Sequence, residues 1–301
     1  MTDYQTSVPI KSFLFVPGDS EKKMDKARGS NAAALILDLE DSVSAERIDI
    51  ARTLVREFLV SNADRKRQQL WVRINPLSSS MNLPDLAAIL PGAPDGVMLP
   101  KVASAQDVMV VDHYLTALEQ REGLPLKAVR ILPVVTETPA AMFSLQSYQG
   151  CSARLAGLTW GAEDLSAAVG ASGNRLENGE YEFTYQLARS LCLLGANAAG
   201  VQPIETISTN FRDPEALLRD VRASRRAGFT GKMAIHPDQV DIINQGFSPD
   251  EAEVQRAKAI VSAFENGISG AGTVQIDGQM LDKPHLVQAL RVLASAAPSG
   301  I

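Results

Sequence analysis

The chain has 301 residues, of which 45% are hydrophobic and 21% are charged, so it can bury a large core and its composition excludes general disorder. Its formal net charge of −6, without a basic arm, argues against nucleic-acid binding. The two cysteines, Cys151 and Cys192, belong to no zinc or disulfide motif. The first residues lack the apolar core of a signal peptide, and no apolar run reaches membrane-spanning length, which predicts a cytoplasmic protein with no membrane partner.

Short apolar runs alternate with amphipathic stretches along the chain. Eight runs have the pattern of buried strands, at residues 12–18, 33–41, 70–76, 96–102, 131–138, 155–161, 200–207 and 231–237. Helices are expected between them, in the second half at 140–147, 180–194, 214–227 and 238–245. The runs are continuously apolar, as in parallel strands covered by helices, which predicts repeated βα units.

Polar and charged side chains stand at the ends of these runs, which favours a closed (β/α)₈ barrel, an α/β TIM barrel, over an open doubly wound sheet. In such a barrel the carboxyl ends of all eight strands meet at one mouth, where active sites lie. The residues concerned are Glu40, Asp41, Arg73, Lys101, Glu137, Glu163, Asp164 and His236.

The last part of the chain lies outside the eight units. We assign residues 1–264 to a barrel catalytic domain and residues 265–301 to a C-terminal linker and lid segment. The glycine-rich stretch 266–272 is the expected linker, so the tail can cover its own barrel mouth or that of a neighbour.

Glu137 and Asp164 are the candidate metal ligands. Each ends a predicted strand, and the two strands are consecutive, so a barrel places the two carboxylates side by side. Without nearby histidine or cysteine ligands, two carboxylates suit Mg²⁺. The alternative is that each is an acid in the first turn of a helix, where the helix dipole favours it.

Arg73 is a candidate clamp for a substrate carboxylate, through its planar guanidinium. An equally simple alternative is an ion pair with acids at the end of the preceding strand, Asp38, Glu40 or Asp41.

Gly161, Ala162 and Glu163 form a strand-to-helix turn whose backbone N–H groups could bind an anionic substrate oxygen, although Gly161 could serve the turn alone. The three histidines share no ligand-like spacing, and His236 is read as structural or orienting.

Several strings, taken together, give the chain a recognisable pattern: SFLFVPGDSEKK, ALILDLEDSV, VRIN, VMLPKV, ETPAA, WGAEDL, NFRD, GFTGKMAIHPDQV and GQMLDKP. In this order, from Ser12 to Pro284, they resemble the citrate lyase beta-subunit-like family, within the HpcH/HpaI aldolase and malate-synthase-like superfamily. The resemblance covers nearly the whole chain.

This resemblance implies a TIM barrel, assembled as a homotrimer or hexamer, that binds Mg²⁺ and an acyl-CoA or acyl-carrier thioester. It implies that Glu137 and Asp164 bind the metal and that Arg73 stabilises an enolate. It also implies that Asp282, in GQMLDKP, is a catalytic acid or base supplied by the tail of a neighbouring subunit. The chain departs from the family pattern in two places. Lys11 replaces a common arginine, and residues 202–205 read QPIE where relatives often carry an Ile-Asp pair, so Gln202, Pro203 and Glu205 are expected to alter that side of the mouth.

The expected activity is that of a Mg²⁺-dependent carbon–carbon lyase. It would cleave a 3-hydroxyacyl-CoA such as citramalyl-CoA or malyl-CoA to acetyl-CoA and a 2-oxo acid, reversibly. The alternatives are a citryl-carrier-protein lyase subunit of citrate lyase, an aldolase for free 2-oxo acids, a thioester hydrolase on the same scaffold, and a barrel without catalytic activity.

Overall fold

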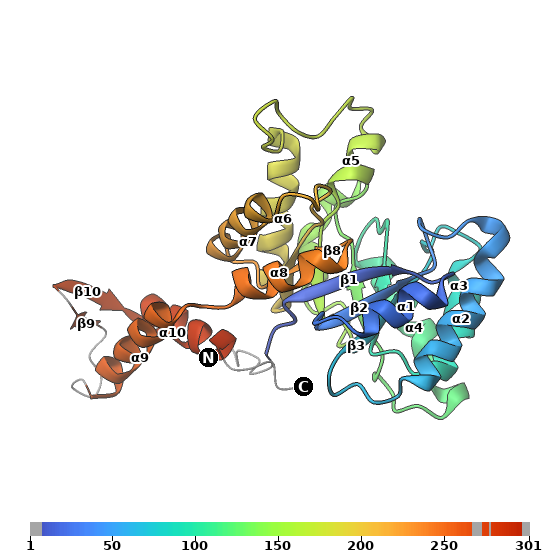
Figure 1. Cartoon of the computed structure of the whole chain (residues 1–301), viewed down its shortest axis with the longest axis horizontal. Coiled ribbons are helices and arrows are strands. Elements are labelled where there is room, and N and C mark those ends of the chain that lie inside the picture. Colours follow the sequence, from blue (N-terminus) through green and yellow to red (C-terminus); the bar gives the residue numbers. More distant parts are fainter. Residues whose placement is uncertain (1–7, 267–272, 277, 297–301) are drawn as a thin grey trace.

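Eight parallel strands form the centre of the computed structural model, which describes residues 8–266, 273–276 and 278–296 (Figure 1). The strands are β1 (Ser12–Pro17), β2 (Ala34–Asp38), β3 (Gln69–Arg73), β4 (Gly96–Leu99), β5 (Arg130–Pro133), β6 (Gly157–Thr159), β7 (Gln202–Glu205) and β8 (Gly231–Ala234). Their order is β5-β4-β3-β2-β1-β8-β7-β6, every pair parallel. Bridges between Ile131 and Leu155 and between Val134 and Thr159 join β5 to β6, so the predicted TIM barrel is confirmed.

Helices surround this barrel. They are α1 (Glu21–Arg28), α2 (Ile48–Ser61), α3 (Asn82–Ile89), α4 (Ala105–Glu122), α5 (Ala162–Ala168), α6 (Phe183–Ala199), α7 (Pro214–Ala227) and α8 (Val240–Phe247). Short 3₁₀ helices add η1 (Ala45–Arg47), η2 (Leu90–Gly92), η3 (Ala141–Phe143), η4 (Leu145–Tyr148) and η5 (Pro237–Gln239). Among the described helices, none is long and apolar enough to cross a membrane.

The helix expected at 140–147 was a wrong prediction, because two 3₁₀ helices, η3 and η4, stand there instead. The hydroxyls of Ser144 and Ser147 bond to the carbonyls of Ala141 and Ser144, and such local bonds compete with an α-helix.

Two hydrophobic layers hold the barrel together. Side chains such as Phe13, Ile36, Trp71 and Met98 fill its interior, and a larger layer lies between strands and helices. A Cβ atom at Gly96 would lie 2.2 Å from the Trp71 ring, so only glycine leaves room for this tryptophan. Alternation along each strand then determines which residue at the carboxyl end faces inward.

The C-terminal elements form a separate unit. They are α9 (Glu251–Asn266), β9 (Thr273–Ile276), β10 (Gln279–Asp282) and α10 (Lys283–Ala296), with β9 and β10 antiparallel. This unit has its own hydrophobic cluster, which contains Ala257, Ile260, Leu281 and Ala289, so α9 packs with the tail. The domain boundary at 264/265 stays a prediction, and the expected linker after Asn266 lies outside the described residues.

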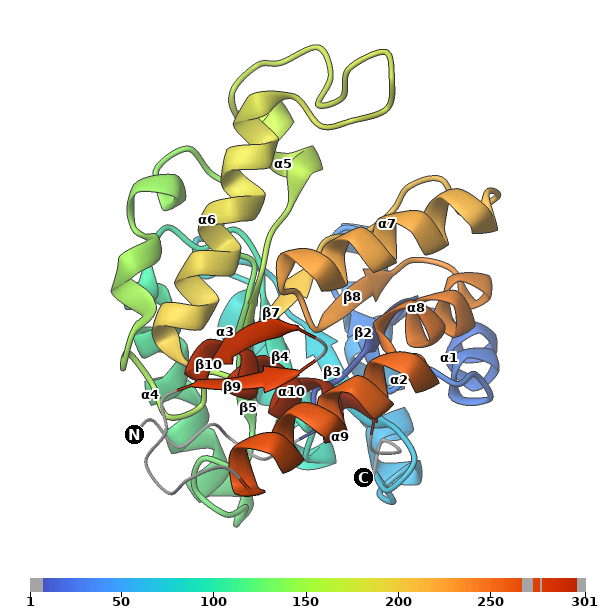
Figure 2. The same ribbon diagram turned by 90° about the vertical axis from the view of Figure 1, so that its left-hand side faces the viewer.

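Figure 2 looks at the amino ends of the strands, with the C-terminal unit in front of the barrel. The unit extends away from the barrel on this side, opposite to the carboxyl ends (Figure 1). The C-terminal unit therefore does not cover the mouth of its own barrel.

Arg154 lies at the seam between β5 and β6 and is fully buried. Its guanidinium bonds Glu119 at 2.6 and 2.7 Å and Asp112 at 2.5 Å, and its carbonyl accepts the N–H of Ile131 at 2.8 Å. Glu119 is also completely buried, so its charge depends on this arginine and on two backbone N–H groups.

Replacing Arg154 with methionine should lower the free energy of unfolding by about 3–5 kcal/mol, because it leaves a buried carboxylate without its counter-ion. Urea denaturation checks this against Arg121→Met, which removes a half-exposed arginine from the same region. Equal, small losses of unfolding free energy in the two variants would show that the buried ion pair stabilises the fold no more than the half-exposed Arg121 does.

Candidate active site

Asp38 and Arg73 form the centre of the mouth. They are register partners at the ends of β2 and β3 and lie on the inward face, in line with Ile36 and Trp71. Arg73 Nε and Nη2 donate to Asp38 Oδ1 and Oδ2, each at 2.7 Å, which is a bidentate pair. The guanidinium lies 5.0 Å from the ring centre of Phe15, so it is fixed on several sides.

The remaining nitrogen of Arg73 faces two further acids. Nη1 lies 2.8 Å from Glu40 Oε2 and 3.2 Å from Asp41 Oδ2. Burial lowers the pKa of Arg73, but Asp38 above all, followed by Glu40 and Asp41, raises it and holds it above its usual value. The alternative given to Arg73, an ion pair with these acids, is thus present, and its role toward substrate stays a prediction. Asp41 is the partner that a substrate carboxylate could replace, since its side chain is 54% exposed.

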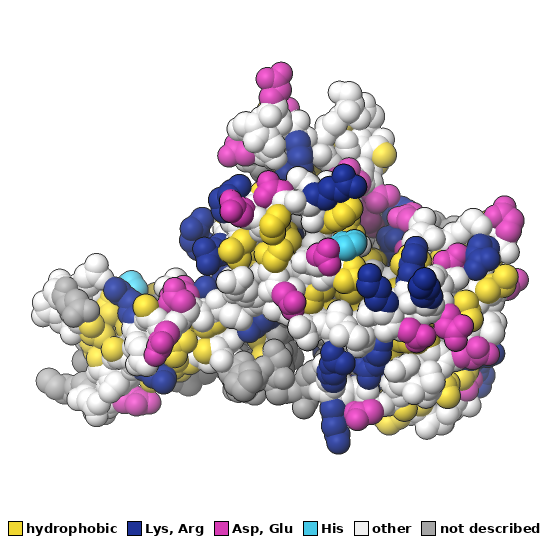
Figure 3. Space-filling model, in the orientation of Figure 1, with side chains coloured by type: hydrophobic (Ala, Val, Ile, Leu, Met, Phe, Trp, Pro, Cys, Tyr) yellow, Lys and Arg dark blue, Asp and Glu magenta, His cyan; other side chains and the backbone are white. Residues whose placement is uncertain are grey.

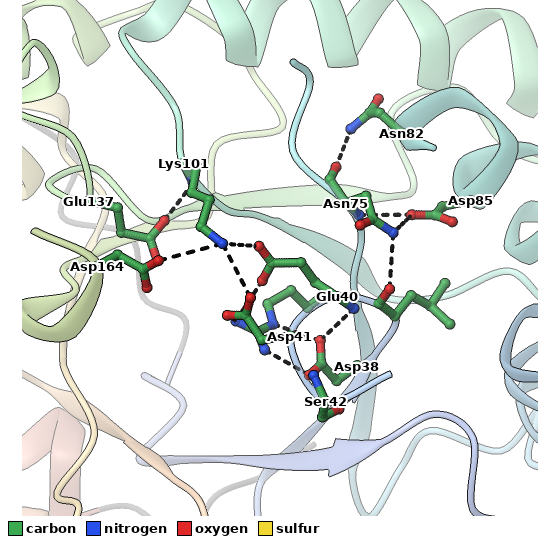
Figure 4. Close-up of polar contacts among 12 residues, drawn as sticks. Asp38, Glu40, Asp41, Ser42, Asn75, Asn82, Asp85, Lys101, Glu137 and Asp164 are labelled. Carbon is green, nitrogen blue, oxygen red and sulfur yellow. Dashed lines mark hydrogen bonds and ion pairs between the residues drawn. The ribbon is translucent and has the colours of Figure 1, made fainter. Parts of the chain in front are cut away.

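Lys101 connects the acids of the mouth, although it was not among the site residues expected from the sequence. Its Nζ lies 2.5 Å from Glu40 Oε1, 3.2 Å from Asp41 Oδ1 and 3.5 Å from Asp164 Oδ1 (Figure 4). Its backbone adopts a φ of 53°, which is unfavourable for a side chain of this kind. This conformation directs the Lys101 N–H to Glu137 Oε2 at 2.5 Å.

Glu137 and Asp164 lie next to each other, as expected, on the two sides of the β5–β6 seam (Figure 4). Glu137 is 5% exposed, whereas the Asp164 side chain is 35% exposed and faces the opening. Burial raises the pKa of Glu137 to about 8, and the carboxylates of Asp164 and Glu40 add to the rise. A carboxyl group with this pKa is mostly protonated at pH 7, so without a cation the seam does not keep all of its carboxylates ionised, whereas a bound cation would favour the ionised form of Glu137.

The donor set fits a hard divalent cation. Among the described residues no three acids, histidines or cysteines form a ready-made metal cage. Mg²⁺ does not need one, since it commonly takes one or two carboxylates and completes its shell with water and substrate oxygens. Glu40 Oε2 is buried and accepts no well-aligned hydrogen bond, although Arg73 Nη1 lies 2.8 Å away as its ion-pair partner.

Gly161, Ala162 and Glu163 stand where expected, at the start of α5 beside Asp164. The Gly161 N–H donates to Thr136 Oγ1 at 3.1 Å, so this donor is already used. A Cβ atom at position 161 would lie 2.9 Å from Glu137 Cγ, so glycine permits the close approach of the turn to the buried carboxylate. Their contact with substrate stays a prediction.

A polar network below the mouth fixes the loops that carry these groups. Asn75 donates from its backbone and its side chain to Asp85, both at 2.8 Å, and its amide also bonds the Leu39 carbonyl at 3.0 Å (Figure 4). Arg52 pairs with Asp85 at 2.7 Å. The loops after β2 and β3 are thus connected, which restricts the position of Arg73.

The positions that depart from the family pattern lie at both ends of the barrel. Lys11 precedes β1, at the amino ends of the strands. Gln202 begins β7 at the same end, where its side chain bonds the backbone of Ile10 at 2.7 and 3.3 Å. Glu205 is at the carboxyl end but binds Trp160 and Arg189 at 2.6 and 2.7 Å. The expectation that residues 202–205 alter the mouth therefore does not hold for these side-chain contacts.

Two histidines have defined roles. His236 caps η5 by accepting the N–H of Asp238, and its ring stacks on Phe211 at 4.8 Å. His285 lies in the first turn of α10, and its Nδ1 lies 2.5 Å from Asp282 Oδ1. Asp282 is half-exposed at the end of β10, so the tail presents an accessible carboxylate that a histidine orients.

A closed barrel of parallel strands with clustered acids, one arginine and one lysine at its mouth has the architecture of a (β/α)₈-barrel enzyme. The chain matches the family described as HpcH/HpaI aldolase/citrate lyase over residues 11–237, and it belongs to this family. The resemblance noted from the sequence is thereby confirmed.

Named relatives are similar over almost their whole length. Citrate lyase subunit beta of Haemophilus influenzae is 32% identical, with 97% of this chain and 98% of the relative covered. The (3S)-malyl-CoA thioesterase of Cereibacter sphaeroides is 33% identical, with 96% and 95% covered. The structure of CitE from Mycobacterium tuberculosis in complex with magnesium, acetoacetate and coenzyme A matches with a TM-score of 0.77 at 30% identity, covering 96% of this chain and 98% of that one.

Replacing Lys101 with methionine should destabilise the protein by about 1–3 kcal/mol at pH 7.5, because it removes charged hydrogen bonds from the acids of the mouth. The loss should be smaller at pH 4.5, because burial raises the pKa of Glu40, so this partner of Lys101 becomes protonated early as the pH falls. Denaturation at both pH values measures this, with Lys66→Met as an exposed control. An equal loss at both pH values would contradict the electrostatic role.

Proposed function

We propose that this protein is a Mg²⁺-dependent lyase that cleaves a 3-hydroxyacyl-CoA to acetyl-CoA and a 2-oxo acid. Citramalyl-CoA and malyl-CoA are the proposed substrates. The observation that carries the proposal is the pair of adjacent carboxylates, Glu137 and Asp164, beside Arg73 and Lys101 at one mouth. Support also comes from the similar CitE structure, which is a complex with magnesium and coenzyme A.

Glu137 and Asp164 would hold the cation, whose positive charge would compensate the acids at the seam. When bound, Mg²⁺ supplies Lewis acidity toward the hydroxyl and carboxylate oxygens of the substrate. Lys101 Nζ lies 3.5 Å from Asp164 and would retain its contacts with Glu40 and Asp41. Gly161 would keep the α5 turn close to Glu137.

In the cleavage, a base at the mouth takes the hydroxyl proton, the C–C bond breaks to release the 2-oxo acid, and the bonding electron pair stays on the thioester as an enolate. Arg73 is suited to stabilise the growing negative charge, because Asp38 holds its guanidinium in a fixed orientation. Protonation of the enolate carbon gives acetyl-CoA. We assign this proton to Asp282 of a neighbouring subunit, oriented by His285.

A thioester hydrolase is the second candidate, because the Cereibacter relative named for this activity is as similar as the citrate lyase subunit. In that reaction water attacks the thioester carbonyl and releases CoA as a free thiol. A citryl-carrier lyase subunit and an aldolase for free 2-oxo acids use the same mouth with a different acyl carrier or with none.

The reaction products distinguish these functions. With Mg²⁺ and a panel of malyl-CoA, citramalyl-CoA and citryl-CoA, we expect glyoxylate, pyruvate or oxaloacetate to appear in equal amount with acetyl-CoA. Glu137→Ala should remove this activity and leave the fold intact, because it deletes a cation ligand at the mouth. Free thiol without a 2-oxo acid would identify a hydrolase, and full activity in excess chelator would contradict the metal's role.

Shared sites predict complementation between inactive variants. Asp282→Asn removes the titratable group and should lower kcat while substrate still binds. Asp164→Ala should be inactive for lack of a metal ligand. After subunit exchange, a mixture of the two should recover about one quarter of wild-type activity, from random pairing of intact barrels with intact tails in a symmetric oligomer. Confirmed exchange without recovery would show that Asp282 does not act across subunits.

A further inference from the structure

Lys11 is a buried cation without a buried anion beside it. It lies directly before β1 and is only 9% exposed. Its Nζ donates to the hydroxyl of Ser248 at 2.9 Å, and it forms no ion pair with any carboxylate in the described part of the chain. Burying an unpaired ammonium costs free energy, so an anion bound beside Lys11 would be stabilising.

The surroundings of Lys11 add positive charge. Arg67 donates to the carbonyls of Gly29 and Ser30 at 3.2 and 2.9 Å but pairs with no described carboxylate. Burial lowers the pKa of Lys11, and the guanidinium of Arg225, which is itself paired with Glu253 at 2.9 Å, lowers it further. The local field therefore attracts an anion although the whole chain is acidic.

A cavity of about 680 Å³ opens beside these groups. Its cationic lining consists of Lys11, Arg67 and Lys258, with Glu251 as the acid among its lining residues. Asn31, Asn244 and Ser248 add amide and hydroxyl groups. This volume and this combination of charged and neutral donors match a site for a small molecule.

The cavity lies at the junction of the two units of the chain. Lys11 and Arg67 precede β1 and β3, at the amino ends of the strands, and Lys258 belongs to α9 of the C-terminal unit. The candidate active site is at the other end of the barrel. Figure 3 shows Lys and Arg side chains on the molecular surface near this junction, between the C-terminal unit and the barrel.

We propose that this cavity binds a small multivalent oxyanion, a phosphate ester or a polycarboxylate. Its oxygens would accept from the ammonium of Lys11 and the guanidinium of Arg67, and Lys258 would contact it from α9. The ligand would then connect the barrel to the unit that carries Asp282. The cavity and its charges alone carry this inference, which holds for any reaction at the mouth.

Calorimetric titration in metal-free buffer tests the site, with pyrophosphate and citrate as separate probes. The wild-type protein should bind at least one of them, and the probe that binds identifies phosphate or carboxylate as the preferred group. Lys11→Met/Arg67→Gln should weaken this binding roughly tenfold or more, by the loss of two charge-assisted contacts. The control Arg56→Gln/Arg219→Gln removes the same charge from exposed positions outside the cavity and should change the affinity less than about twofold.

Three results would overturn the proposal. The first is that the wild-type protein binds neither probe. The second is that the cavity variant binds as tightly as the wild type, which would locate the anion elsewhere, such as at the mouth. The third is that the two double variants lose affinity equally, which would indicate only general charge attraction.

A further double variant keeps the test valid if the variant that contains Lys11→Met does not fold. Arg67 and Lys258 are both exposed, so Arg67→Gln/Lys258→Gln should fold even if Lys11→Met does not. In this variant the binding probe should raise the Tm clearly less than in the wild type, because ligand binding stabilises in proportion to affinity. An equal rise in Tm would contradict the site in the same way as unchanged affinity.

Discussion

The constraint on which the mouth depends is the convergence of five carboxyl groups in a partly buried place. Asp38, Glu40, Asp41, Glu137 and Asp164 converge there, and Arg73 and Lys101 neutralise only part of them. Burial alone raises the pKa of a carboxyl group, and neighbouring carboxylates raise it further. The arrangement is costly for an empty site and becomes favourable when a cation and an anionic substrate arrive together. The strain in the Lys101 backbone belongs to the same compromise.

Charge divides along the barrel axis. The carboxyl ends of the strands collect acids, and the amino ends carry Lys11, Arg67 and the nearby Arg225. In a parallel barrel, the residue just before a strand and the residue just after it lie at opposite ends. One chain can thus offer two sites of opposite character without mixing them. The net charge of the whole sequence does not predict the charge of either site, because each site depends on a few local side chains.

Much of the mouth could be predicted from the sequence because strand order and alternation determine it. Glu137, Asp164 and Arg73 follow apolar runs, so a parallel barrel brings them to one end. Lys101 was placed at the mouth but was given no role, because its positive φ and its contact with Glu137 arise from tertiary structure that the sequence pattern does not contain. The α-helix predicted at 140–147 is absent because serine hydroxyls donate hydrogen bonds to nearby backbone carbonyls and so compete with the bonds of an α-helix. The side of the barrel on which the C-terminal unit lies depends on tertiary contacts, and the local pattern of apolar and polar residues does not reveal these.

The separate hydrophobic cluster of the C-terminal unit has a consequence for how the molecule opens. A unit with its own core and few links to the barrel, such as the Arg225–Glu253 ion pair at 2.9 Å, can unfold without taking the barrel with it. Backbone amides of α9 and α10 should therefore exchange with solvent deuterium through a lower-energy opening than those of β2 and β3. Heating would pass through a species with an intact barrel and a melted tail, so the chain would not behave as a single two-state system.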